Sequence, residues 1–143
     1  MNYYIQMRKI TDDIFVIIKE PINDINLLEI PLTVKQITLN SCKIHDIPVD
    51  FFIKFKNLKC IELKDNYLTD INFILNDSVI WLDVSMNKLL NNSFETFKSS
   101  SLVHLNISFN HLTELLPIFE SIKEVVYDHN DIVIKKYTVE STS

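Results

Sequence analysis

The sequence predicts a solenoid of the α/β class, with a curved parallel β-sheet on its concave side and short helical or extended returns on its convex side. Three observations support this prediction. One apolar pattern occurs five times between residues 34 and 134. Its copies start 24, 21, 23 and 20 residues apart, as expected for stacked repeats. Within each copy, apolar and variable residues alternate as in a strand with one buried face.

The repeated pattern is plainest in the copy Leu102-x-x-Leu105-x-Ile107-x-x-Asn110-x-Leu112. We number its places from the first apolar residue, so that Leu102 is at place one and Asn110 is at place nine. The five copies begin at Val34, Leu58, Val79, Leu102 and Ile122. Apolar residues make up 47% of the chain, so one such match carries little weight, whereas five in register indicate a repeat protein.

Each copy is expected to contribute one short strand. Places four and six point into the core, and places three, five and seven point to the concave face. A single short strand cannot bury its apolar side alone. Successive copies therefore stack in parallel, about 4.8 Å apart, and share one core.

The ninth place marks the end of the strand, where backbone N–H and C=O groups lose their ladder partners. Asparagine can satisfy both kinds of group, because its amide donates and accepts hydrogen bonds. A buried cysteine, which is small and a weak donor, can fill the same place. The sequence therefore predicts a structural ladder made of Cys42, Asn66, Asn87, Asn110 and Asn130.

The five copies resemble the leucine-rich-repeat consensus LxxLxLxxNxL, which covers about 100 of the 143 residues. The chain departs from it at Cys42, which replaces the first asparagine, and at Tyr127, which stands at a usually aliphatic place. The resemblance implies a protein that binds other macromolecules on the curved face of its sheet. The Ile- and Asn-rich composition is also similar to that of small leucine-rich-repeat proteins of AT-rich large DNA viruses such as insect poxviruses. That likeness implies an intracellular role in engaging host proteins.

The repeats divide the chain into three parts. Residues 1–33 are expected to cap the N-terminal end, with a degenerate repeat, because an uncovered solenoid end exposes its core. Residues 34–134 hold the five repeats, and residues 135–143 form the end of a C-terminal strand and a polar tail. The phenylalanine spacing predicts helical turns in the first and third returns, and the shorter second and fourth returns are expected to be extended or 3₁₀.

Composition restricts the partner and the compartment. The net charge of -5 disfavours nucleic acid and acidic membranes, since attraction to either needs clustered Lys and Arg. The N-terminus lacks a secretory-signal pattern, and no apolar run is long enough to span a bilayer. With only Cys42 and Cys60, a disulfide framework is not expected. These features predict a cytoplasmic protein without a cofactor.

The candidate binding residues come from the concave face and from the adjacent rim at places eight and ten, here called the ascending rim. They are Trp81, Tyr67, Met86, Phe109, Glu62, Asp83, His104 and Asn106. Large aromatic side chains near the middle of a surface are typical of binding hot spots. Glu62 and Asp83 favour a basic or hydrogen-bonding segment of a protein partner.

Other interpretations are open at this point. Trp81 or Phe109 can instead cover a neighbouring side chain of the same chain. The solenoid can also self-associate as a weak homodimer, through its concave face or its ends. An enzyme is not expected, because Cys60 and His104 lie two repeats apart, about 10 Å by ordinary strand spacing. No metal site is predicted, since the histidines occupy different places of the repeat.

Overall fold

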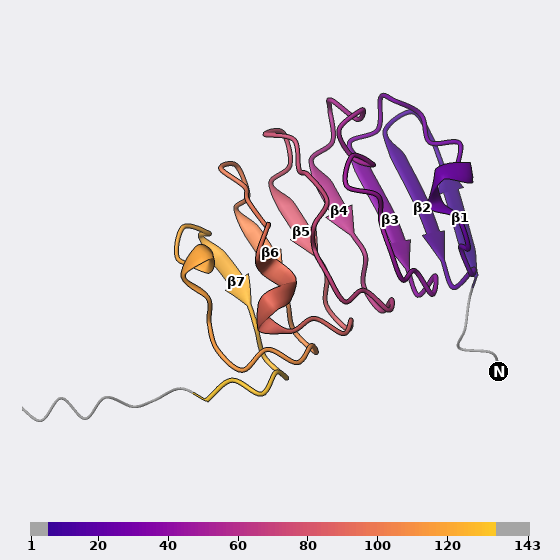
Figure 1. The fold of residues 1–143 in the computed structure, drawn as a ribbon. Coiled ribbons are helices and arrows are strands. Elements are labelled where there is room, and N and C mark those ends of the chain that lie inside the picture. Colours follow the sequence, from indigo (N-terminus) through magenta and orange to yellow (C-terminus); the bar gives the residue numbers. More distant parts are fainter. Residues whose placement is uncertain (1–5, 134–143) are drawn as a thin grey trace, which may run out of the picture.

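Seven strands form one sheet in the computed structural model, which describes residues 6–133. Their order in the sheet is their order in the chain (Figure 1). The strands are β1 (Met7–Ile10), β2 (Ile14–Ile18), β3 (Gln36–Asn40), β4 (Cys60–Glu62), β5 (Trp81–Asp83), β6 (His104–Asn106) and β7 (Glu124–Val126). From β2 to β7 every pairing is parallel. The predicted parallel-sheet solenoid is confirmed.

The strands of the five repeats pair in register. The third-place residues form one row across the sheet, namely Gln36, Cys60, Trp81, His104 and Glu124. The fifth-place residues form the next row, namely Thr38, Glu62, Asp83, Asn106 and Val126. Side chains at equal places of neighbouring repeats therefore lie side by side.

The sheet begins with a hairpin that the repeat pattern does not predict. β1 pairs with β2 antiparallel, and Thr11 Oγ1 closes the turn by accepting from the backbone N–H groups of Asp13 and Ile14, at 3.2 and 3.0 Å. β2 then pairs in parallel with β3, with Ile17 opposite Leu39. β2 thus acts as an additional rung before the first repeat.

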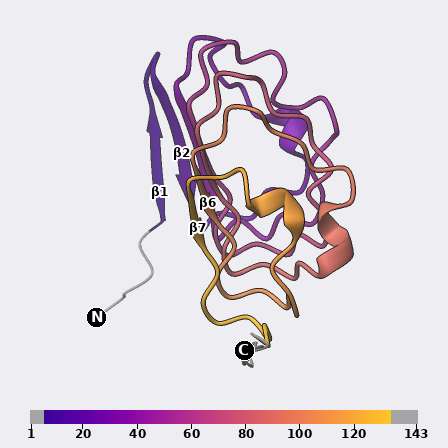
Figure 2. The same ribbon diagram turned by 90° about the vertical axis from the view of Figure 1, so that its left-hand side faces the viewer.

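The return segments lie opposite the strands and contain short helical turns (Figure 2). These turns are 3₁₀ helices, namely η1 (Ile25–Leu27), η2 (Asn91–Phe94) and η3 (Pro117–Phe119). The first return is a chain of tight turns, in which the N–H groups of Phe51 and Phe55 donate to the carbonyl groups three residues before them. Within residues 6–133 no α-helix is present, so the returns pack mainly as turns and extended chain.

The core lies between the sheet and the returns. Fourth-place residues such as Ile61 and Leu82 are fully buried. Phenylalanines from neighbouring returns belong to the same core and pack against one another edge to face, with ring centroids of Phe52 and Phe73 5.2 Å apart and those of Phe94 and Phe119 5.1 Å apart. Such contacts join neighbouring returns as the sheet joins neighbouring strands.

Two further expectations concern the C-terminal strand end and the lack of a membrane span. The predicted strand end and tail at residues 135–143 lie outside the described residues. Within residues 6–133, no helix has the length and apolar character required to cross a membrane.

Candidate protein-binding surface

A column of asparagine side chains runs across the ends of the strands. Nδ2 of Asn87 donates to the carbonyl groups of Val84 and Ser85 in its own repeat, at 2.9 and 3.1 Å. It also donates to the carbonyl of Leu63 in the preceding repeat, at 3.0 Å. Its Oδ1 accepts from the N–H of Leu68, also in the preceding repeat, at 3.0 Å. Each asparagine therefore ties its repeat to the one before.

The same arrangement recurs at the other ninth places. Asn66, Asn110 and Asn130 each donate to the sixth-place carbonyl of their own repeat and to that of the preceding one. In the first repeat, the thiol of Cys42 lies 3.4 Å from the carbonyl oxygen of Ile17, on β2. Cys42 thus contacts the carbonyl of the preceding rung, β2, as each asparagine contacts the preceding repeat. Burial raises the pKa of the Cys42 thiol.

The eighth place has the same unusual backbone conformation in every repeat. Positive φ angles of 55° or 56° occur at the eighth-place residues Ser41, Asp65, Met86, Phe109 and His129, and positive φ is also found at Lys19, directly after β2, and at Lys43. In this conformation the N–H of Met86 reaches the carbonyl of Ser108 on the next rung, at 3.0 Å. Left-handed backbone costs a bulky residue about 1–2 kcal/mol, and Asn or Asp adopts it more readily. Met86 and Phe109 are therefore placed where the fold favours small polar residues.

Trp81 lies on the concave face and is stacked on His104. The two rings are 3.6 Å apart between centroids and 14° from parallel. His104 is only 7% exposed, whereas Trp81 remains 42% exposed. Beyond it, Glu124 Oε1 is 3.1 Å from His104 Nδ1, a close contact whose angles are not those of a hydrogen bond. The predicted binding residue His104 thus lies largely beneath Trp81, and it supports the indole from below.

The ascending rim carries a second aromatic stack. The ring of Phe109 lies flat on that of His129, with centroids 4.1 Å apart and planes 5° from parallel, and Phe109 is still 48% exposed. His129 is not among the predicted binding residues, although it shares the eighth place with Phe109. The shared place in the repeat is therefore enough to predict that Phe109 and His129 are neighbours on the rim.

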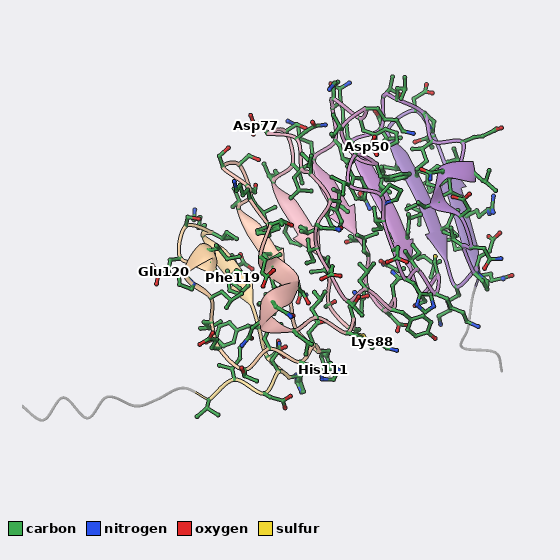
Figure 3. The ribbon with its side chains drawn as sticks, in the orientation of Figure 1. Asp50, Asp77, Lys88, His111, Phe119 and Glu120 are labelled. Atoms are coloured by element: carbon green, nitrogen blue, oxygen red, sulfur yellow. The ribbon has the colours of Figure 1, made fainter. Side chains whose placement is uncertain are left out.

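Tyr67 occupies a different part of the rim. Its ring is 5.0 Å from that of His45 and lies 4.8 Å from Nζ of Lys88. Lys88 and His111, at place ten of neighbouring repeats, lie along the lower edge of the ribbon in Figure 3, whereas Asp50 and Asp77 lie along its upper edge. Tyr67 thus belongs to a mixed aromatic and basic part of the rim.

A floor of polar residues separates Trp81 from Phe109. Asp83 Oδ1 accepts from the N–H and hydroxyl of Ser85, at 2.9 and 2.6 Å. Asn106 Oδ1 makes the same two contacts with Ser108, at 3.0 and 2.6 Å. Trp81 is at place three and Phe109 is at place eight of the next repeat, so these polar residues at places five and seven lie between them. The predicted binding residues therefore form two aromatic groups with a polar floor between them.

Two carboxylates stand directly opposite each other on this floor. Glu62 on β4 is the register partner of Asp83 on β5. Glu62 Oε2 accepts from the hydroxyl of Thr38 at 3.1 Å. Within residues 6–133, neither carboxylate is paired with a Lys, Arg or His side chain. The pKa of the nearby Cys60 thiol is raised to about 12, mainly by burial and to a smaller extent by the negative charges of Glu62 and Asp83.

The concave face brings together few of the groups that catalysis needs. Trp81 stands between Cys60 and His104 in the third-place row, and a thiol with a pKa of about 12 is a weak nucleophile at neutral pH. In the part of the chain that the structure describes, no group of three or more His, Cys, Asp or Glu side chains is arranged to hold a metal ion.

Two comparisons point to leucine-rich-repeat proteins. The chain is 36% identical, over 81 residues, to an uncharacterized leucine-rich repeat-containing protein of Schizosaccharomyces pombe; the match covers 53% of this chain and 13% of that protein. The crystal structure of an internalin from Listeria monocytogenes superposes with a TM-score of 0.50 over 85% of this chain and 43% of the internalin, at 17% identity. No family model matches the sequence.

These likenesses support a leucine-rich-repeat family and show that the fold is a solenoid of leucine-rich-repeat type. The chain spans a small part of the yeast protein and less than half of the internalin. Neither protein is viral, so the likeness to poxvirus proteins rests on composition alone.

Proposed function

We propose that the chain is a non-enzymatic protein-binding module, which holds a protein partner on the concave face and ascending rim of its solenoid. The observation that carries this proposal is the exposure of large apolar side chains on neighbouring repeats. Trp81, Tyr67, Met86 and Phe109 are 42%, 36%, 39% and 48% exposed. Aromatic residues held in fixed positions bury much surface on binding and lose little conformational entropy.

The backbone at the rim adds weight to this proposal. Met86 and Phe109 hold left-handed backbone conformations, at φ 55° each, although a smaller polar residue fits such a place at lower free energy. Met86 is also 39% exposed and Phe109 48% exposed, so both leave a substantial apolar surface in water. Binding to a partner accounts for both features, because contact with another protein removes this apolar surface from water.

Paired affinity purifications test the proposal. The wild-type protein, Trp81→Ala and Phe109→Ala are used as bait in extracts of the cell that produces the protein, and retained proteins are identified by mass spectrometry. We expect each variant to lose the partner that the wild type retains. Leu27→Ala is the control, because Leu27 is 78% exposed on η1, away from the concave face, and its removal should leave capture intact.

Thermal unfolding separates a binding role from a structural one. Loss of the stack on His104 should contribute about 1 kcal/mol to the stability loss of Trp81→Ala, and loss of the covered part of the indole adds to it. If a variant loses the partner together with most of its stability, the side chain is structural and the proposal fails. Analytical ultracentrifugation checks the remaining alternative, since a wild-type dimer that Trp81→Ala dissociates would assign the same surface to self-association.

A further inference from the structure

We propose that the partner's segment is basic, and that a guanidinium or ammonium group of this segment binds between Glu62 and Asp83 while its stem packs on the exposed surface of Trp81. This inference rests on the proposed function and adds to it the chemistry of the partner. It follows from three features of the concave face: an aromatic platform, an unneutralised pair of carboxylates beside it, and hydrogen bonds that hold each carboxylate in place.

The carboxylate pair places two acidic side chains opposite each other without a cationic partner among the described residues. Glu62 and Asp83 are directly opposite on neighbouring parallel strands, and both are half-buried. Like charges in such a pairing destabilise a sheet. No cationic side chain of residues 6–133 is paired with either group. A cation from a partner would turn this unfavourable arrangement into a favourable one.

Each carboxylate is held by one oxygen and leaves the other without a hydrogen bond among the described residues. Glu62 Oε2 accepts from Thr38, whose hydroxyl in turn accepts from Gln36 Nε2 at 2.9 Å. Asp83 Oδ1 accepts both bonds from Ser85. The second oxygen of each group can therefore accept from a ligand without loss of these contacts. A guanidinium, whose five N–H donors lie in one plane, suits two neighbouring oxygens.

The Trp81 platform supplies the second half of the recognition. Trp81 and Asp83 lie two residues apart on β5, so the indole and the carboxylate are on the same face of one strand. His104 covers one face of the indole, which leaves Trp81 42% exposed for another contact. Tryptophan is the aromatic side chain that attracts cations most strongly, and arginine stacks on it readily. Apolar and ionic contacts thus converge on one side chain of the partner.

A peptide selection tests this chemistry without knowledge of the natural partner. A random-peptide library displayed on phage is selected against the full wild-type chain, and selected peptides are synthesised. Their affinity is measured from the emission of Trp81, the only tryptophan of the chain. The same titrations are repeated with Glu62→Gln/Asp83→Asn and with the matched control Glu95→Gln, which removes an exposed carboxylate beside η2.

We expect the selected peptides to be rich in Arg and Lys and to bind the double variant at least about tenfold more weakly than the wild type. Glu95→Gln should bind them as the wild type does. In the absence of peptide, the double variant should be no less stable than the wild type, because it removes the repulsion and keeps an acceptor oxygen for Thr38 and for Ser85.

Several results would overturn the inference. Selected peptides without basic residues that still bind at Trp81 would leave the protein-binding function standing and remove only the cationic partner. Basic peptides that bind the double variant equally well, or no recovery of peptides above background, would also reject it. A wild-type dimer that the double variant strengthens would show that the surface serves a second copy of the chain instead.

Discussion

The indole of Trp81 rests on the imidazole of His104, with ring centroids 3.6 Å apart. Because Trp81 is the chain's only tryptophan, the fluorescence reports on the surroundings of this indole, of which the His104 ring is a part. We expect His104→Ala to shift the emission to longer wavelength and to increase quenching by acrylamide, since the indole loses its support and becomes more exposed to water. His129→Ala is the control: it removes the stack on Phe109 and should leave the emission unchanged. An unshifted spectrum in His104→Ala would contradict the stacked arrangement.

The asparagine column should be essential to stability. Asn87→Ala removes hydrogen bonds to three buried carbonyl groups and one N–H group, so we expect a loss of about 3 kcal/mol or more in the free energy of unfolding. Urea denaturation followed by circular dichroism measures this loss. Asn72→Ala changes an exposed asparagine and should lower stability by less than about 0.5 kcal/mol. Equal losses in both variants would argue against the ladder.

The left-handed rim predicts a trade between stability and binding. Asn adopts positive φ more readily than Met does, so Met86→Asn should raise the free energy of unfolding by about 0.5–1 kcal/mol. The same change should weaken capture of the protein partner, because it removes exposed apolar surface. Ile80→Asn, at an exposed residue without a positive φ, should bring no such gain. Thermal unfolding and affinity purification of the variants are compared.

The Cys60 thiol should make the protein less stable in alkali. Its pKa is raised from the ordinary 9.0 to about 12, first by burial and then by Glu62 and Asp83. Above pH 9 the unfolded thiol loses its proton while the folded thiol keeps it, so the unfolded state binds fewer protons and stability falls as pH rises toward 12. Cys60→Ser lacks this contribution. Its free energy of unfolding should decline less than that of the wild type between pH 8 and about pH 10.5, as measured by urea denaturation.

Alkylation provides a second measurement of the same thiol. Native Cys60 should react slowly with iodoacetamide at pH 8, and Glu62→Gln/Asp83→Asn should speed the reaction, since loss of the two carboxylates lowers the thiol pKa. Peptide mapping by mass spectrometry distinguishes Cys60 from Cys42. An unchanged rate in the double variant would mean that burial alone raises the pKa.

The sequence is sufficient to predict the strands of the five repeats and their register, because the repeat relates places that are far apart in the chain. It predicts, for example, that Glu62 and Asp83 belong to one row. It does not predict that Trp81 covers His104, because the direction of a side chain on an open face depends on its rotamer and its neighbours. The register places Phe109 and His129 in neighbouring repeats at the same place, but it does not predict that their rings stack.

The hairpin and the returns are harder still to predict. β1 follows no repeat, and its four residues are all exposed, so no periodic burial indicates a strand. In the first return, Phe51, Phe52 and Phe55 have spacings that suit a helix, yet the segment forms successive turns. Burial of these rings against Phe73 and the sheet is achieved equally well by turns, and local sequence spacing does not distinguish the two.

The ninth-place contacts also bear on how the length of such a chain can change. The side chain of Asn110 needs from its predecessor only a carbonyl at Val84 and an N–H at Leu89, and every repeat offers backbone groups at these two places. A whole unit gained or lost by gene duplication or deletion would therefore meet matching neighbours on both sides. Because those partners are main-chain atoms, most side-chain substitutions do not affect the contact between neighbouring repeats. The solvent-facing residues of the sheet can therefore change while the repeats remain stacked.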